Sequence, residues 1–260
     1  IPDRVIEAGA RRRSAAAAAT PAAVSGRVSR LADGRVGKFG WKAQTATLKE
    51  FNSQAAASEI GLETPDHHQA ADPRSPSAEP APGLDLTAAQ LDALTAFVRS
   101  LPRPIVEADD GAAQLARAGK NVFRTAGCVA CHVPKLGEVD GLYSDLLLHD
   151  MGASARDVGN YGVFAAGAAD PPPALARPGR REPDAPPSDS EWRTPPLWGL
   201  RASAPYWHDG RARTIEQAIA LHDGEAAGSA QRFARLSDRE KQQLRAFLDS
   251  LAPPRQAAPE

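Results

Sequence analysis

The chain has 260 residues and a formal net charge of −1; 42% of its residues are hydrophobic, 24% charged and 5% aromatic. This balance gives no overall attraction to nucleic acid or to an anionic membrane, so any function must come from a local site. No segment reaches the roughly 18 apolar residues that span a bilayer. The length suffices for one or two domains, and the low aromatic content argues against a β-sandwich. We therefore predict a soluble, mainly α-helical protein.

The first predicted elements are two helices in the N-terminal half. Thr47 and Leu48 open one of them, six and seven residues after Trp41, and the segment 86–101 forms the other. The second helix begins with a threonine that can cap its N-terminus, carries apolar residues at helical spacing and ends at a proline.

A third predicted helix leads to the cysteines. It covers residues 111–123 and ends four residues before the first cysteine. One face of it carries Leu115, Gly119, Val122 and Phe123. The glycine on this face lets another helix approach closely.

The chain has two cysteines, Cys128 and Cys131, followed at once by His132. Their spacing alone fits a redox pair, half of a zinc site or a disulfide. A zinc site needs further soft ligands, and a thioredoxin-like pair needs a βαβ context; the sequence offers neither. Cys-x-x-Cys-His is the attachment signal of c-type haem. One helical turn brings both sulfurs to the haem vinyl groups, and the histidine offers the iron an imidazole nitrogen. We predict one covalent haem c and, because this attachment requires export, a periplasmic protein.

The remaining elements follow the haem motif. Residues 165–191 form an insertion rich in Pro, Ala, Arg and Asp, in which we expect no regular structure. Thr214 opens a helix six residues after His208, and the segment 236–251 forms the last helix.

The sequence contains an internal repeat. The segment 86–101 recurs 150 positions later, with six coincident pairs: Leu86/Leu236, Leu94/Leu244, Ala96/Ala246, Phe97/Phe247, Ser100/Ser250 and Leu101/Leu251. The interval from Trp41 to Thr47 also recurs from His208 to Thr214. Chance similarity of two amphipathic helices would explain the first correspondence alone, but two in the same order favour related units. Cys128 lies 80 residues before His208, and the matching position in the first unit lies upstream of Ile1. We therefore expect an N-terminally truncated chain that lacks a first haem motif.

Several motifs resemble the bacterial di-haem cytochrome c peroxidase superfamily, and within it the di-haem oxidoreductase branch, also called thiol oxidoreductases. They are Lys38–Ala43, Glu59–Gly61, Cys128–His132, Tyr143–Gly152, Glu191–Trp198, Ala204–Arg211 and Thr214–Glu225. The resemblance implies a mainly α fold with two cytochrome c-like haem domains and long irregular loops. Residues 1–103 would be the remainder of the N-terminal, peroxidatic domain without its haem motif. Residues 109–258 would be the C-terminal cytochrome c domain with one covalent haem.

The resemblance also implies an activity. The C-terminal haem would pass electrons to a peroxide-reducing N-terminal haem, so the full-length protein would carry two haems, with calcium as a further candidate cofactor. The expected partners are a small redox donor protein or a quinol-linked cytochrome, with hydrogen peroxide as substrate and no nucleic acid. One alternative is a mono-haem electron-transfer module without catalysis. Another is long-range oxidation of a protein substrate, as in the methylamine-utilisation relative.

The haem iron needs a second ligand opposite His132. His222, eight residues after Thr214, stands where relatives place an axial methionine, and we favour it over Met151, the sole methionine. A histidine near a helix C-terminus could instead interact with the helix dipole. Ligation by two imidazoles would lower the reduction potential relative to a His/Met pair.

The resemblance assigns further roles. Trp41 aligns with a tryptophan between the haems, although it could equally be a core residue. Glu59 aligns with a distal carboxylate that moves a proton between the peroxide oxygens, although exposed glutamates are common. Phe51 stands where relatives often have a glutamine, which weakens the expectation of ordinary peroxidase activity. Four further residues are expected at haem edges or at the interdomain face, in hydrogen-bonded networks: His149, His208, Asp209 and Arg211.

Overall fold

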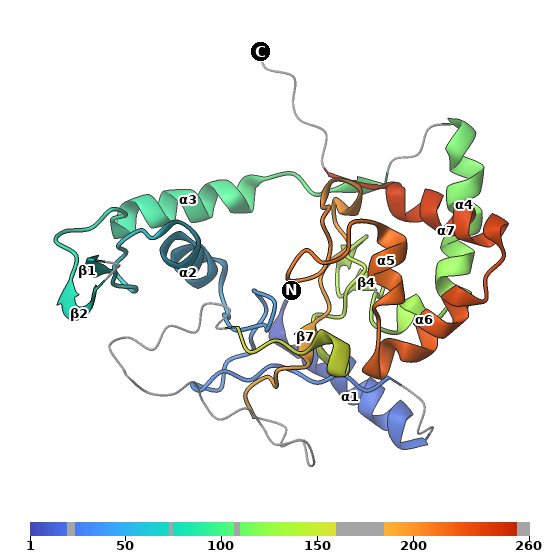
Figure 1. Cartoon of the computed structure of the whole chain (residues 1–260), viewed down its shortest axis with the longest axis horizontal. Coiled ribbons are helices and arrows are strands. Elements are labelled where there is room, and N and C mark those ends of the chain that lie inside the picture. Colours follow the sequence, from blue (N-terminus) through green and yellow to red (C-terminus); the bar gives the residue numbers. More distant parts are fainter. Residues whose placement is uncertain (20–23, 73–74, 107–109, 160–184, 254–260) are drawn as a thin grey trace. The chain divides into compact units, whose positions relative to one another are not determined.

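The structure is a computed structural model of the chain, and it describes residues 1–19, 24–72, 75–106, 110–159 and 185–253. Most of the insertion predicted at 165–191 lies outside these ranges. The described residues contain seven α-helices (Figure 1): α1 (Asp3–Ala19), α2 (Leu48–Ile60), α3 (Ala88–Ser100), α4 (Asp110–Thr125), α5 (Ile215–Ala220), α6 (Ala227–Ala234) and α7 (Asp238–Asp249). The mainly α-helical character is as predicted.

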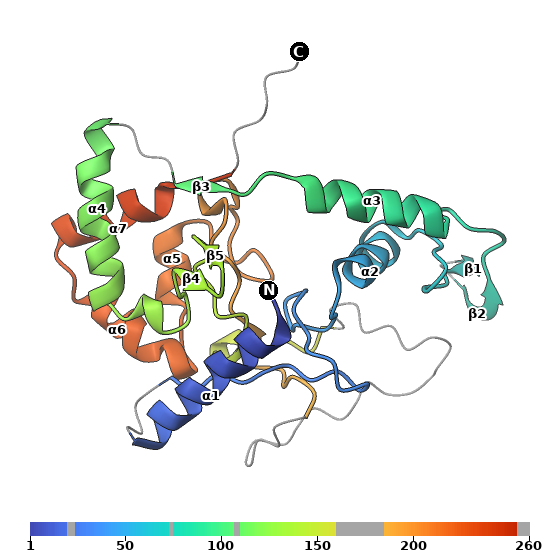
Figure 2. The ribbon, with the colours of Figure 1, turned by 180° about the vertical axis from the view of Figure 1, so that it is seen from behind.

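The strands are short and pair in antiparallel ribbons. They are β1 (Ala70–Asp72) with β2 (Ser75–Pro80), β3 (Ile105–Val106) with β8 (Leu251–Ala252), β4 (Lys135–Leu136) with β5 (Val139–Asp140), and β6 (Leu148–Asp150) with β7 (Glu191–Arg193). Figure 2 brings α1 and the β4–β5 ribbon into view. None of the helices in the described ranges is long and apolar enough to cross a lipid bilayer.

The chain divides into two compact units. Unit 1 comprises residues 1–28, 102–157 and 189–260, and unit 2 comprises residues 29–101 and 158–188. Because residues 1–28 belong to unit 1, the compact units do not coincide with the predicted domains at 1–103 and 109–258. The assignment of those domains as cytochrome c-like stays a prediction.

Helices α4 and α7 pack closely against each other in unit 1. They pack at Gly119, where a Cβ atom would overlap the carbonyl of Gln243 and press on Phe247. The surrounding core consists of Val122, Phe123, Tyr143, Ile215, Phe233, Leu244, Phe247, Leu248 and Leu251. The predicted packing face of α4 is therefore present, except that Leu115 is exposed. The buried face is centred on Ala116, Gly119 and Phe123, and Leu115 lies at its edge.

Four helices begin where the sequence predicts. Each has a capping box, in which the capping hydroxyl accepts from the third helical N–H and the third side chain accepts from the cap N–H. The pairs are Thr47/Glu50 in α2, Thr87/Gln90 in α3, Thr214/Gln217 in α5 and Ser237/Glu240 in α7. Each of these helix starts is determined by residues within four positions of one another, so it can be predicted from the sequence.

The turns before α2 and α5 have the same backbone geometry. Phe39 bridges Thr45 in one, and Tyr206 bridges Ala212 in the other, at a constant offset along the chain. Both turns use left-handed backbone at two equivalent positions: Gly40 (φ 81°) and Ala43 (φ 50°) in the first, Trp207 (φ 74°) and Gly210 (φ 71°) in the second. This agreement supports the internal repeat inferred from the sequence.

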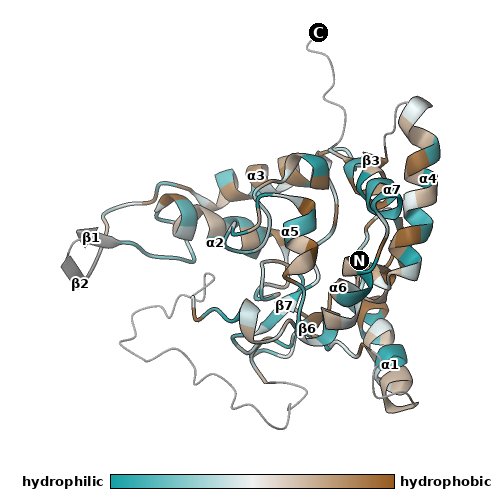
Figure 3. Cartoon of the chain, turned by 45° about the vertical axis from the view of Figure 1, so that its right-hand side comes forward, coloured by the Kyte–Doolittle hydropathy of each residue, from teal (hydrophilic) through white to brown (hydrophobic). Residues whose placement is uncertain are grey.

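In unit 2, α3 packs against α2 through one face only. Leu91 is buried, the Asn52 amide donates to the Thr95 hydroxyl (3.2 Å), and Lys49 pairs with Asp92 (2.6 Å). Another part of α3 and its C-terminal end expose apolar side chains, with Leu94, Phe97 and Leu101 at 37%, 61% and 50% exposure. Hydrophobic segments are visible on α3 in Figure 3.

Candidate functional site

The two cysteines lie on a single turn directly after α4. Gly127 ends the helix in a left-handed conformation (φ 85°), which glycine adopts without steric cost. The following 3-10 turn runs from Cys128 to Ala130, and the His132 N–H donates to the Cys128 carbonyl (2.9 Å). Both thiols are free. Burial raises the pKa of the Cys128 thiol to about 11, so this thiol is protonated at neutral pH.

The backbone holds the His132 ring. Its Nδ1 lies 2.9 Å from the Tyr143 carbonyl, which can only accept, so Nδ1 carries the proton and Nε2 keeps its lone pair. Burial lowers the pKa of His132 to about 4; the hydrogen bond to Tyr143 opposes this shift, and the nearby His222 adds to it. The imidazole is therefore neutral at pH 7, which is the form that binds metals.

His222 is held in the same way. It follows the end of α5, and its Nδ1 donates to the Ala218 carbonyl (2.8 Å), which again leaves the lone pair on Nε2. Burial lowers the pKa of His222 as well, against the effect of that hydrogen bond. The other candidate, Met151, follows β6, and its N–H donates to the Ser190 carbonyl (2.9 Å). The choice of His222 as axial ligand stays a prediction.

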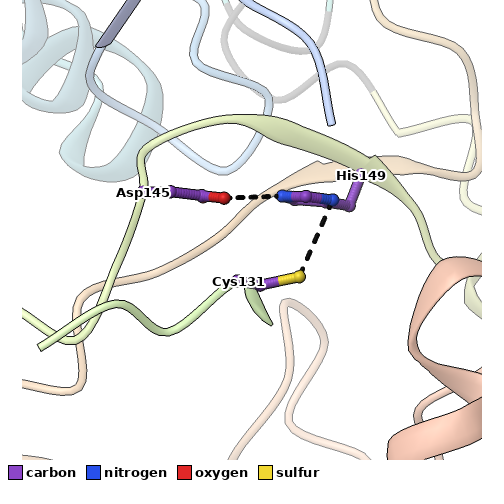
Figure 4. Close-up of side chains that lie close together, drawn as sticks. All are labelled: Cys131, Asp145 and His149. Atoms are coloured by element: carbon purple, nitrogen blue, oxygen red, sulfur yellow. Dashed lines mark hydrogen bonds and ion pairs between the residues drawn. The ribbon is translucent and has the colours of Figure 1, made fainter. Parts of the chain in front are cut away.

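His149 lies in a buried charged cluster beside Cys131 (Figure 4). Its Nε2 is 3.0 Å from an Asp145 oxygen, while its Nδ1 is 2.9 Å from a Glu225 oxygen and 3.7 Å from the Cys131 sulfur. Arg13 of α1 also pairs with Asp145 (3.1 Å). Burial alone would lower the pKa of His149, but the hydrogen bonds to Asp145, Cys131 and Glu225 outweigh it and raise the pKa well above its usual value.

Short backbone pairing positions this cluster. His149 lies in the middle of β6, opposite Trp192 of β7, and Arg27 pairs with Leu148 at the other edge of β6. The N–H of Gly26 donates to Glu225 (3.1 Å), and Gly26 leaves room for the imidazole because any Cβ there would overlap the His149 ring. The β-pairing therefore places His149 beside the turn that carries Cys131.

Cys131, Asp145 and His149 also have the composition of a metal site, with ligand atoms within 4.8 Å of one another. A thioether at Cys131 would remove the thiolate that such a site requires. The two uses of this cysteine therefore exclude one another.

His208 lies against aromatic side chains. Its ring stacks on Trp192, with centroids 3.7 Å apart and planes 12° apart, and its Nε2 is 3.4 Å from an Asp157 oxygen. Asp209 and Arg211 form an exposed ion pair (2.5 Å), and hydrogen bonds from Arg211 lower the pKa of Asp209. Arg211 also donates to the Ser154 carbonyl (2.7 Å). The predicted roles of His208, Asp209 and Arg211 beside a haem stay proposals.

The two predicted catalytic residues belong to unit 2. Trp41 lies in the turn before α2 and is 39% exposed. Glu59 lies in the last turn of α2 and is also exposed. Phe51, at the position where relatives often have glutamine, stacks on Phe39 with centroids 6.0 Å apart.

Comparison with known proteins shows which protein family the chain belongs to. The family model described as "Di-haem oxidoreductase, putative peroxidase" matches residues 26–251, which is most of the chain. This chain belongs to the di-haem oxidoreductase family. The resemblance recognised in the sequence is thereby confirmed.

The sequence identity between this chain and its individual relatives is low. It is 27% identical over 181 residues to the gamma subunit of hydrazine synthase from Kuenenia stuttgartiensis, covering 62% of this chain and 49% of the relative. The chain thus spans about half the length of that curated relative. A structure of the K. stuttgartiensis hydrazine synthase under xenon gives a TM-score of 0.43 at 23% identity, over 65% of this chain and 57% of the other. A MauG-like protein associated with microbial copper homeostasis gives 0.45 at 18% identity, over 98% and 90%.

The residues of this chain fit the haem that its family implies. Two free thiols lie on one turn, and two neutral imidazoles each have Nδ1 bonded to a carbonyl and a lone pair on Nε2. In a c-type haem, two such thiols form thioethers with the vinyl groups, and imidazoles ligate the iron. Cys128, Cys131, His132 and His222 would hold the group.

Sequence reasoning missed several partners of these residues. Asp145 stands four residues before His149 in the matched motif, and this spacing was the available signal. Glu225 closes another matched motif, but nothing in the sequence indicated that it reaches His149, 76 positions away. The sequence could not identify the Ala218 carbonyl as the partner of His222, because every residue has a backbone carbonyl.

Proposed function

We propose that this chain is the electron-transferring part of a periplasmic di-haem oxidoreductase. Cys128 and Cys131 would hold one covalent haem c, and His132 and His222 would ligate its iron. Bound there, the group would supply one-electron transfer to a peroxide-reducing haem carried by polypeptide N-terminal to Ile1. The observation that supports this most directly is the pair of neutral imidazoles, each held through Nδ1 by a backbone carbonyl. They stand close enough for His222 to lower the pKa of His132.

Haem bound at this place supplies reversible one-electron chemistry between ferric and ferrous iron. The chain's own residues set the conditions for it. The carbonyls of Tyr143 and Ala218 fix which nitrogen of each imidazole can bind a metal, and such outer contacts raise the basicity of the ligand. His149, held cationic between Asp145 and Glu225, places a positive charge beside the attachment sulfur of Cys131.

The exposed face of α3 supports the proposal that unit 2 is the remainder of a second haem domain. Leu94, Phe97 and Leu101 correspond in the repeat to Leu244, Phe247 and Leu251. In unit 1 those counterparts are buried in the core that α7 forms with α4, the helix that precedes the haem motif. A helix of the α4 kind, preceding a first haem motif, would cover the equivalent face of α3.

In this arrangement Trp41 would be the electron relay between the haems, and Glu59 the general acid–base that moves a proton within bound peroxide. The exposure of both side chains is compatible with a partner domain and a substrate reaching them. Hydrogen peroxide is the proposed substrate, and a small redox protein or quinol-linked cytochrome the proposed donor. Calcium remains a candidate additional cofactor.

A second candidate function is a mono-haem electron-transfer module without catalysis. The single Cys-x-x-Cys-His motif in these 260 residues favours it. The two candidates differ in what precedes Ile1 in the gene. A reading frame that continues upstream into another Cys-x-x-Cys-His supports the di-haem enzyme, and one that starts without it supports the module.

The chain should carry one covalent haem when it is exported together with a cytochrome c maturation system. Only Cys128 and Cys131 can form thioethers, so replacing both with serine should abolish the haem that resists acid–acetone extraction. A pyridine haemochrome assay measures haem per chain. The serine replacement Thr125→Ser, just before the motif, is a control that should retain one haem. Two haems per chain, or none in the unaltered protein, would contradict the proposal.

His222→Met should convert a bis-histidine haem into a His/Met haem. The near-infrared sulfur-to-iron band should appear and the reduction potential should rise, because a thioether stabilises ferrous iron. Met151→Leu serves as the control and should leave the spectrum unchanged. The assignment of His222 is wrong if the unaltered protein already shows that band and Met151→Leu removes it.

A further inference from the structure

Trp207 has a backbone conformation that bulky residues rarely adopt. Its φ is 74°, in the left-handed region where a large side chain meets steric strain. The equivalent position in the repeated turn of unit 2 is Gly40, with φ 81°, and glycine takes this conformation without a Cβ clash. The turn therefore requires left-handed backbone at this position, and unit 1 supplies it with a tryptophan. Strain of this kind persists where the side chain has a task.

The Trp207 side chain is directed at His222. The two rings meet edge to face, with centroids 6.0 Å apart and planes 88° apart. The indole N–H donates to the Ala218 carbonyl (3.1 Å), the same oxygen that accepts from His222 Nδ1 (2.8 Å). One backbone oxygen therefore joins the indole and the imidazole.

The end of helix α5 explains why this oxygen can accept both bonds. The last carbonyls of a helix have no backbone donor one turn further on. The His222 N–H, which would serve Ala218 in a longer helix, donates to Ile219 instead (3.1 Å). The Ala218 oxygen has two lone pairs, and the two ring N–H groups use them.

We propose that Trp207 is a positioning residue for His222 that sets both the plane of the imidazole and its strength as a ligand. The inference rests on the proposed ligation by His222. The edge-to-face contact fixes the plane of the ring. The second hydrogen bond to the Ala218 oxygen makes it a weaker acceptor for His222 Nδ1–H, which leaves less electron density on Nε2.

The direction of the effect follows from ligand basicity. An imidazole whose N–H donates a strong hydrogen bond is a more basic ligand. Removing the indole N–H lets Ala218 accept more strongly from His222, which favours ferric iron. Trp207 therefore raises the reduction potential of the site.

The test uses Trp207→Phe in the haem-loaded chain, which keeps a ring and removes the N–H. We expect the midpoint potential to shift downward. We also expect the low-spin EPR g values, which report the orientation of the axial imidazole planes, to shift or broaden. The control is Trp198→Phe, because Trp198 also donates its indole N–H to a backbone carbonyl in unit 1, that of Gly141 (2.8 Å). This variant should change neither quantity.

A second variant distinguishes the loss of the positioning role of Trp207 from a failure of the protein to fold. Trp207→Gly gives the turn the residue that the equivalent turn of unit 2 already has, so it relieves the backbone strain. It should fold and still show the lowered potential. An unchanged potential in both Trp207 variants, or a potential that rises, overturns the proposal.

The assignment of His222 as a ligand, on which the role of Trp207 depends, is tested separately. If His222→Ala leaves the low-spin spectrum of the protein intact, His222 is not a ligand, and the proposed ligation fails together with the role of Trp207. If His222→Ala removes that spectrum while the Trp207 variants behave like Trp198→Phe, the ligation stands and only the role of Trp207 is rejected.

Discussion

Replacing Phe247 with alanine should lower the free energy of unfolding of unit 1 by about 3–5 kcal/mol, the usual cost of truncating a buried phenylalanine. The Phe247 ring meets Phe123 and Tyr143 at centroid distances of 5.2 and 5.5 Å, and its Cβ lies against Gly119, where α4 and α7 pack. The neighbours cannot close the cavity without moving α7. Amide hydrogen exchange measured on peptides from α4 and α7 follows unit 1 alone, and urea unfolding followed by circular dichroism gives the free energy.

Phe97→Ala is the matched control, because the repeat places Phe97 at the position of Phe247. Its ring is 61% exposed, so the substitution should change stability by no more than about 0.5 kcal/mol. In a protein extended upstream of Ile1, the same substitution should become nearly as costly as Phe247→Ala. Equal and large losses for both variants in the 260-residue chain would show that the α3 face is already covered.

The helices could be predicted because their signals are local. A hydroxyl residue followed three positions later by Glu or Gln, as in Ser237 and Glu240, identifies a helix start from four residues. The ribbons could not be predicted in the same way. Strand β3 pairs Ile105 with Ala252, nearly 150 positions apart, and a two-residue strand carries no periodic pattern.

The part of the candidate site that could be predicted from the sequence is the part formed by one contiguous motif. Cys128, Cys131 and His132 are contiguous, so their spacing indicates haem attachment without any knowledge of the fold. The setting of His149 depends on Arg13, Asp145 and Glu225, which only folding brings together. The internal repeat could also have indicated the unusual backbone of Trp207. Trp207 aligns with Gly40, and a glycine at the equivalent position suggests a left-handed conformation, which is unusual for a bulky residue.

His149→Leu should destabilise unit 1 by about 3–5 kcal/mol near pH 6, the cost of removing one partner from a buried charged pair. The imidazole is 2% exposed and lies between two carboxylates, so leucine would leave both facing an apolar side chain. Lys49→Leu is the control, since Lys49 and Asp92 are both exposed (43% and 63%) and form their ion pair at the surface. Exposed pairs of this kind contribute at most about 1 kcal/mol.

The pH dependence tests whether the charge on His149 causes the effect. The folded protein raises the pKa of His149 well above its usual value, so protonation favours the folded state. Its contribution is fully present below the pKa of an unfolded histidine, about 6.5, and is lost as the pH rises through the folded pKa. Leucine does not titrate, so the stability difference between the unaltered protein and His149→Leu should be largest near pH 6 and shrink in alkaline solution. Urea unfolding at a series of pH values measures this difference. A difference that grows with pH would mean that His149 is neutral in the folded protein and that Asp145 and Glu225 are balanced by other groups.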